Sequence, residues 1–188
     1  MFGIGSNPCY MYWQAALPDG VCDEIINEGL KLKLSEAIIG QNESSEVDET
    51  VRKSMTSWID NDSWVGALTK YYTEKANRES GWNYEIVGSE KIQFTVYQPG
   101  GFYNFHEDTA KAGEDYKYVR KLSTVFTITE PVNYDEGIFE FEFGGYKPEI
   151  RSRGSILVFP SFMKHRVTPI TRGVRYSLVN WFHGPQFK

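Results

Sequence analysis

The chain has 188 residues, with 25 acidic and 20 basic side chains and a net charge of −5. This length predicts a single domain, residues 1–188, and 12 Phe, 12 Tyr and 5 Trp supply the bulk for its core. The acidic balance disfavours a nucleic-acid partner, because no segment concentrates Lys and Arg. With only Cys9 and Cys22, no signal peptide and no run long enough to span a membrane, a reducing, cytoplasmic setting is expected.

The N-terminal part, residues 1–80, is expected to be a helical support. A first helix should begin near Pro18-Asp19 and carry one apolar face, made of Cys22, Ile25, Ile26 and Leu30. A second should follow Asn61-Asp62-Ser63, whose oxygens can cap it. Its stripe of Trp64, Leu68, Tyr71 and Tyr72 is expected to pack onto a sheet rather than to form a cofactor site.

Two polar segments are predicted to be loops. Residues 40–50 are rich in Ser, Glu and Asn, and the wider 40–56 segment is either plain surface or a lid over a substrate site. Farther on, basic residues are scattered among acidic ones and are interpreted as a solvated loop: Lys111, Lys117, Arg120 and Lys121.

Residues 82–185 have the pattern of strands. Apolar residues alternate with others around Ile92, Phe94 and Val96, and again at Phe139, Phe141 and Phe143; 155–159 is a continuous apolar run, and 174–181 alternates once more. Glycine-rich turns separate these runs. Two helices followed by many short strands predict a mainly β fold with flanking helices, an antiparallel sandwich or barrel.

Two of the three histidines belong to a metal-binding pattern. Residues two apart on a strand share a face, so His106 and Asp108 should converge while Glu107 points away. His165 would supply a third ligand from another strand. Two imidazoles and one carboxylate suit a divalent iron with open positions. The alternative is that the three residues bind no metal: the His-x-Asp would lie on the surface, and His165 would be an unrelated core histidine.

The last strand should place Arg175, Ser177 and Trp181 on one face. A buried arginine needs an anion, either a core acid or the far carboxylate of an organic acid bound to the metal. His183 lies two residues beyond Trp181 and is interpreted as a rim residue.

The segments Tyr97–Asp108 and His165–Trp181 resemble prolyl 4-hydroxylase-type Fe(II)/2-oxoglutarate dioxygenases, especially small bacterial or phage members, over roughly 91–185. The resemblance implies a double-stranded β-helix, a distorted jelly roll. It implies Fe(II) on His106, Asp108 and His165, and 2-oxoglutarate held by Arg175 and Ser177. It also implies that the pocket is lined by Tyr97, Val167, Trp181, Thr127, Ser123 and Val125. O2 would be the second cosubstrate, and ascorbate is an auxiliary cofactor to consider.

The activity that this resemblance implies is hydroxylation of a C–H bond with release of succinate and CO2. Asp108 argues against halogenation, because related halogenases carry a small residue there. A prolyl residue in a peptide or protein is the leading substrate, with Arg120, Tyr103 and Trp58 as candidate contacts. A free amino acid or small metabolite, a nucleic acid and a non-catalytic binding module are the alternatives, and the oligomeric state stays open.

Overall fold

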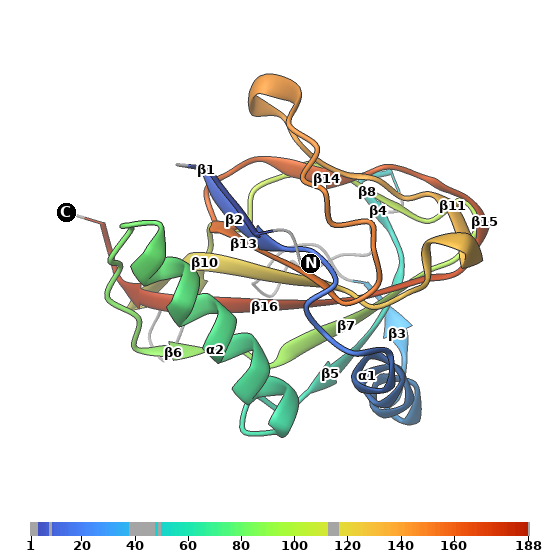
Figure 1. The fold of residues 1–188 in the computed structure, drawn as a ribbon, viewed down its shortest axis with the longest axis horizontal. Coiled ribbons are helices and arrows are strands. Elements are labelled where there is room, and N and C mark those ends of the chain that lie inside the picture. Colours follow the sequence, from blue (N-terminus) through green and yellow to red (C-terminus); the bar gives the residue numbers. More distant parts are fainter. Residues whose placement is uncertain (1–3, 8, 38–47, 49, 113–116, 188) are drawn as a thin grey trace.

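Two sheets face one another, and helices cover the outer side of the larger sheet (Figure 1). The computed structural model describes residues 4–7, 9–37, 48, 50–112 and 117–187. Within them the larger sheet has the order β1 (Ile4–Asn7), β2 (Tyr10–Trp13), β13 (Ser155–Pro160), β10 (Tyr118–Thr127), β16 (Arg175–Pro185), β7 (Ile92–Tyr97), β5 (Met55–Ile59) and β3 (Ser35–Glu36). Two short strands extend it: β6 (Gly88–Ser89) pairs with β16, and β9 (Lys111–Ala112) pairs with β10.

The smaller sheet has the order β12 (Phe139–Phe141), β14 (His165–Val167), β8 (Phe102–His106) and β4 (Arg52–Lys53), and β11 (Tyr134–Glu136) pairs separately with β15 (Ile170–Gly173). The described strand pairings are antiparallel. Short 3-10 turns occur at Pro131–Asn133 and Phe143–Gly145. This architecture is a double-stranded β-helix with flanking helices, which confirms the predicted fold.

Helix α1 (Asp19–Lys31) begins where the sequence predicts and buries Cys22 and Ile25. The predicted apolar face is wrong at its end, because Leu30 is 44% exposed and Gly29 is buried instead. A Cβ at Gly29 would lie 2.3 Å from the ring of Phe94, so only glycine lets the helix approach strand β7 this closely.

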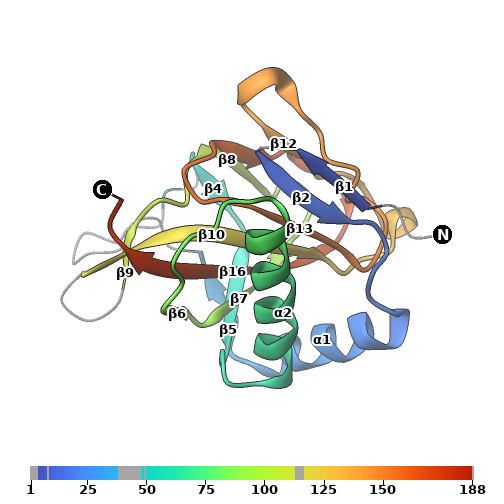
Figure 2. The same ribbon diagram turned by 60° about the vertical axis from the view of Figure 1, so that its left-hand side comes forward.

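Helix α2 (Trp64–Glu79) begins after Ser63, whose hydroxyl accepts from the Gly66 amide at 3.3 Å, as the capping pattern predicts. The predicted aromatic stripe is wrong in part, because Trp64 and Tyr71 are exposed. Small residues form the buried face instead: Val65, Gly66, Thr69, Thr73 and Ala76. Figure 2 shows α2 lying along the large sheet. Because these residues are small, the helix lies close enough for Thr69 and Thr73 to form hydrogen bonds with side chains of the sheet.

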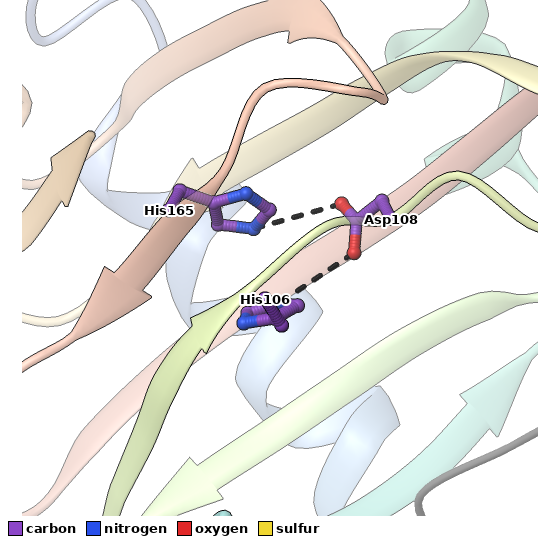
Figure 3. Close-up of side chains that lie close together, drawn as sticks. All are labelled: His106, Asp108 and His165. Atoms are coloured by element: carbon purple, nitrogen blue, oxygen red, sulfur yellow. Dashed lines mark ion pairs between the residues drawn. The ribbon is translucent and has the colours of Figure 1, made fainter. Parts of the chain in front are cut away.

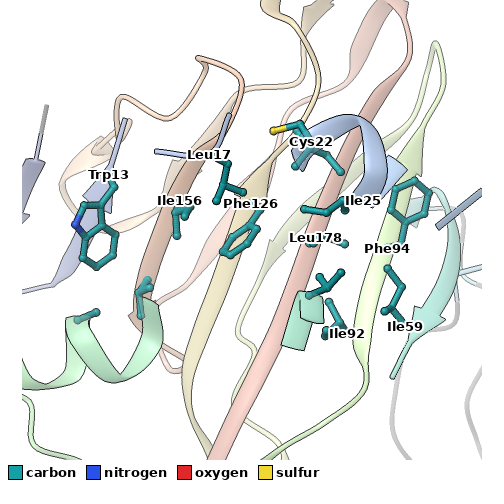
Figure 4. Close-up of a cluster of buried hydrophobic side chains, with 14 of the residues drawn as sticks. Trp13, Leu17, Cys22, Ile25, Ile59, Ile92, Phe94, Phe126, Ile156 and Leu178 are labelled. Carbon is teal, nitrogen blue, oxygen red and sulfur yellow. The ribbon is translucent and has the colours of Figure 1, made fainter. Parts of the chain in front are cut away.

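Alternation along the central strands divides their side chains between two apolar clusters. On β13, Ile156 and Val158 pack under the helices, whereas Leu157 and Phe159 point between the sheets. The outer cluster joins α1 and α2 to the large sheet around Phe126 (Figure 4). The inner cluster contains the residues that surround the candidate site.

Three predictions of local structure need correction or lie beyond what the structure describes. Of the predicted loop 40–56, residues 40–47 and 49 lie outside the described residues, and its far end forms β4 and the start of β5. The basic cluster is not a loop at three of its four residues, because Lys111 lies in β9 and Arg120 and Lys121 lie in β10, where Lys121 is 5% exposed. Strand β12 ends at Phe141, so Phe143 enters a 3-10 turn and is exposed. In the described chain, no helix is both long and apolar enough to cross a membrane.

Candidate metal centre

The side chains of His106, Asp108 and His165 point toward one another (Figure 3). His106 ends β8 and His165 begins β14, and the two are register partners in adjacent strands. Asp108 follows in the loop after β8. Their ligand atoms lie within 4.8 Å of one another, with His106 Nε2 3.6 Å from Asp108 Oδ1 and His165 Nε2 3.7 Å from Asp108 Oδ2.

Backbone carbonyls orient both imidazoles. The Nδ1 of His106 lies 2.8 Å from the carbonyl oxygen of Asn104, and that of His165 lies 2.8 Å from the carbonyl oxygen of Met163. The tautomer that donates from Nδ1 leaves each Nε2 lone pair directed toward Asp108. This arrangement is the usual one for histidines that bind a metal.

The protonation states also suit a cation. Burial alone would raise the pKa of Asp108, but His165, His106 and a hydrogen bond from Ser123 together hold it well below its usual range. Burial lowers the pKa of His165 to about 4, against the opposing pull of Asp108. At neutral pH the site therefore offers an ionised carboxylate beside a neutral imidazole.

The chemistry of these donors fits a divalent metal. Asp108 is 6% exposed, and its Oδ2 has no hydrogen-bond partner among the described residues. A buried anion with imidazole lone pairs beside it lacks a positive charge. Two imidazoles and one carboxylate are typical of Fe(II) sites that keep positions open.

An inner pocket lies beside these residues. Its lining includes six side chains predicted from the sequence: Tyr97, Val125, Val167, Arg175, Ser177 and Trp181. Ser123 is not part of this lining, and other side chains without a predicted role are, among them Gln93, Phe139 and Val179. The pocket is narrow, at about 30 Å³, so a ligand larger than a few waters requires lining side chains to move. Thr127 lines an adjoining pocket, which it shares with Arg175.

Arg175 is a buried cation, 2% exposed, that faces this pocket. Its Nη1 donates to Ser177 Oγ at 3.3 Å, and its Nε has no partner. Among the described residues no carboxylate lies within ion-pair distance, so a structural salt bridge does not explain it. Thr127 Oγ1 and Trp181 Nε1 are likewise buried without partners. A ligand with several oxygen acceptors would satisfy these donors.

A wider cleft of about 610 Å³ opens outside the metal ligands. Trp58, Tyr103 and Arg120, the three candidate substrate contacts, all line it. The Tyr103 ring stacks on His106 with centroids 3.4 Å apart, and burial raises its pKa to about 12. Arg120 is paired with Glu90 at 2.5 Å and lies 4.0 Å from the Trp181 ring.

Glu107 and His183 were predicted not to bind the metal. Glu107 is exposed at the cleft rather than turned to the metal ligands. His183 is partly buried in β16, where it stacks on Tyr118 at 5.7 Å, away from the inner pocket.

Comparisons with known proteins agree with this geometry. Residues 92–183 match the model of the 2OG-Fe(II) oxygenase superfamily. A PKHD-type hydroxylase of Delftia acidovorans is 35% identical over 96 residues, which are 48% of this chain and 42% of that protein. The chain thus spans less than half the length of the curated relatives that it matches.

Solved structures share the fold. A prolyl-4-hydroxylase of Pseudomonas putida superposes with a TM-score of 0.72 at 24% identity, covering 93% of this chain and 92% of that one. A prolyl hydroxylase of Trichoplax adhaerens, in complex with a peptide fragment of hypoxia inducible factor, gives 0.68 at 19%, covering 94% and 84%. Residues 92–183, which hold all three candidate metal ligands, are thus similar to the 2OG-Fe(II) oxygenase superfamily, whose name implies Fe(II) and 2-oxoglutarate, with O2 as the oxidant.

Proposed function

We propose that the chain is a Fe(II)- and 2-oxoglutarate-dependent hydroxylase that acts on a C–H bond, with a prolyl residue of a peptide or protein as the leading substrate. The main support for this proposal is the environment of Arg175. Its guanidinium is buried, has no acidic partner in the described chain, and faces the pocket beside the metal ligands. A dicarboxylate bound at one end to the metal would supply the missing anion at the other.

Each residue has a distinct part in this proposal. His106, Asp108 and His165 hold the metal, and Ser123 supports Asp108 by a hydrogen bond. Arg175 and Ser177 bind the distal carboxylate, with Thr127 as a further donor beside Arg175. Tyr97, Val167 and Trp181 wall the pocket and exclude water. Bound iron, 2-oxoglutarate and O2 would supply the oxidising chemistry, with succinate and CO2 as coproducts.

The outer cleft supports a substrate that reaches the metal from outside the β-helix. It is open along Trp58, Tyr103 and Arg120, and its volume of about 610 Å³ suits a chain segment as well as a small molecule. The fold shared with the peptide-bound Trichoplax enzyme favours a peptide. A non-catalytic module is disfavoured, because such a module gains nothing from buried, unpaired metal ligands and a buried arginine.

The test is the visible charge-transfer band that Fe(II) chelated by 2-oxoglutarate should give in the absence of oxygen. In the wild type the band should saturate with 2-oxoglutarate. Arg175→Gln should keep iron but raise the dissociation constant about ten- to a hundredfold, because it removes a charge-assisted pair. Arg172→Gln, an exposed arginine paired with Asp135, removes the same charge and should change nothing.

His165→Ala should lose the iron and the band together, because only two ligands remain. No band in iron-loaded wild type would reject the proposed function. An unchanged dissociation constant in Arg175→Gln would reject the assignment of the distal carboxylate site. A mass gain of one oxygen in proline-containing peptides then tests the prolyl substrate.

A further inference from the structure

Arg52 is a second buried arginine for which the described chain holds no acidic partner. It lies in β4, at the edge of the smaller sheet, and is 5% exposed. Its Nε donates to Ser54 Oγ at 2.9 Å and its Nη1 to Gln93 Oε1 at 3.3 Å, both neutral acceptors. Its Nη2 is buried with no acceptor at all. A buried guanidinium without a counter-charge is unfavourable, as it is for Arg175.

The position of Arg52 is the wall of the outer cleft, close to the candidate metal ligands. Its guanidinium carbon lies 4.7 Å from the centroid of the Tyr103 ring. The His106 ring centroid lies 3.4 Å from that same centroid, so the guanidinium is at most about 8 Å from the imidazole. A group bound at Arg52 would therefore stand next to the place where a C–H bond is presented.

Among the described residues that line the cleft, Arg52 and Arg120 are the two arginines, and only Arg120 has an acidic partner that the structure describes. Arg120, the other arginine of the cleft, is neutralised by Glu90 at 2.5 Å. Glu36 and Glu107 also line the cleft, yet neither has a described ion pair with Arg52. The polar neighbours fix the guanidinium in place, because Gln93 is itself held by Thr95 at 2.9 Å. The cleft thus contains one fixed, uncompensated positive charge among its described side chains.

We propose that Arg52 binds a carboxylate of the substrate, so that this chain selects substrates with an anionic group close to the hydroxylated carbon. This inference rests on the proposed function and narrows its substrate class. The carboxylate has two sources: the α-carboxylate of a free amino acid or a terminal residue, or the side chain of an acidic residue next to the target. A guanidinium and a carboxylate form a charge-assisted, two-point contact in either case.

The experiment uses tryptophan fluorescence, because Trp58 and Trp181 line the same cleft. The full chain without metal is titrated with N-acetyl-L-proline and with N-acetyl-L-prolinamide, which differ only in the carboxylate. The wild type should bind the acid about ten- to a hundredfold more tightly than the amide. Arg52→Gln should bind both alike, and Arg52→Lys should keep part of the preference.

Two controls separate this site from other effects. Lys53→Gln removes the same charge from the neighbouring residue of β4, which does not line the cleft, and should keep the preference. Arg175→Gln should also keep the preference for the acid over the amide. That result would exclude binding of the acid in the inner pocket. A second pair of ligands, N-acetyl-Pro-Asp-amide and N-acetyl-Pro-Asn-amide, has no α-carboxylate and differs only in the acidic side chain. Tighter binding of the Asp peptide would show that an acidic side chain serves as well as an α-carboxylate.

Equal binding of acid and amide by the wild type would overturn the inference, as would a preference that survives Arg52→Gln. If Arg52→Gln does not fold, as judged by near-ultraviolet circular dichroism, the wild-type comparison and Arg52→Lys decide the question. Failure of the proposed function is a separate result: no charge-transfer band and no succinate with iron and 2-oxoglutarate, while the carboxylate preference persists.

Discussion

The two faces of the large sheet bury polar groups in opposite ways. On the outer face, beneath the helices, Thr73 Oγ1 and Thr124 Oγ1 lie 2.5 Å apart, and Thr69 Oγ1 donates to Asn180 Oδ1 at 2.8 Å. On the inner face, Arg175 Nε and Thr127 Oγ1 are buried without partners. These outer-face hydroxyls are satisfied within the protein, whereas these inner-face donors carry a desolvation cost that a bound ligand would offset.

The largest expected effect compares two buried phenylalanines on the two faces. Phe126→Ala, in the outer cluster, should destabilise the protein by about 3 to 5 kcal/mol through the cavity that it leaves. The folded fraction should bind Fe(II) as the wild type does. Phe159→Ala should lose similar stability and also weaken Fe(II) binding, because its ring lies 4.8 Å from that of His165.

Denaturant unfolding and metal titration of both variants measure the two quantities. Weaker Fe(II) binding by folded Phe126→Ala, equal to that of Phe159→Ala, would contradict the separation of the faces.

The next effect concerns pH and the metal-free protein. Between pH 6.5 and about 4, His165 is protonated when the chain is unfolded and exposes it, but stays neutral when it is buried in the folded protein. The unfolded state therefore binds more protons, and the free energy of unfolding should fall as the pH falls. Over this window His165 contributes a loss of up to about 3 kcal/mol. The loss should be smaller in His165→Asn, as measured by denaturant unfolding at several pH values.

His183, whose pKa burial also lowers, is present in both proteins and serves as the internal reference. The same slope in wild type and His165→Asn would show that His165 does not drive the pH dependence.

The smallest effect uses two threonines of β10 that face opposite ways. Thr124→Val removes a bonded hydroxyl from the outer face and should destabilise by about 1 kcal/mol. Thr127→Val removes an unpartnered hydroxyl from the inner face, so stability should stay the same or rise by up to about 1 kcal/mol. Thermal unfolding compares them, and a clear loss in Thr127→Val would mean that this hydroxyl is already satisfied.

Sequence periodicity determined much of the fold. Alternation on the strands predicted which residues of β16 face the site, and the capping residues predicted the start of α2. Both are local rules, because side chains on a strand repeat every two residues and the free N–H groups at a helix start need an oxygen acceptor nearby. The same rules failed at Leu30 and Gly29, where packing overrides them. Gly29 is buried because it packs against the Phe94 ring of another element, and the helical pattern alone cannot predict that contact.

For the site, the sequence determined the residue types that a metal and a dicarboxylate need, and their order along the chain: His106, Asp108, His165 and Arg175. Only the tertiary structure decided which charges remain unpaired. Arg120 and Arg52 look alike in the sequence, yet Glu90 neutralises the first, and the second has no described acid beside it. Pairing depends on distances between strands far apart in the chain, so a local pattern cannot predict it, and the proposed carboxylate selectivity of the cleft rests on that difference.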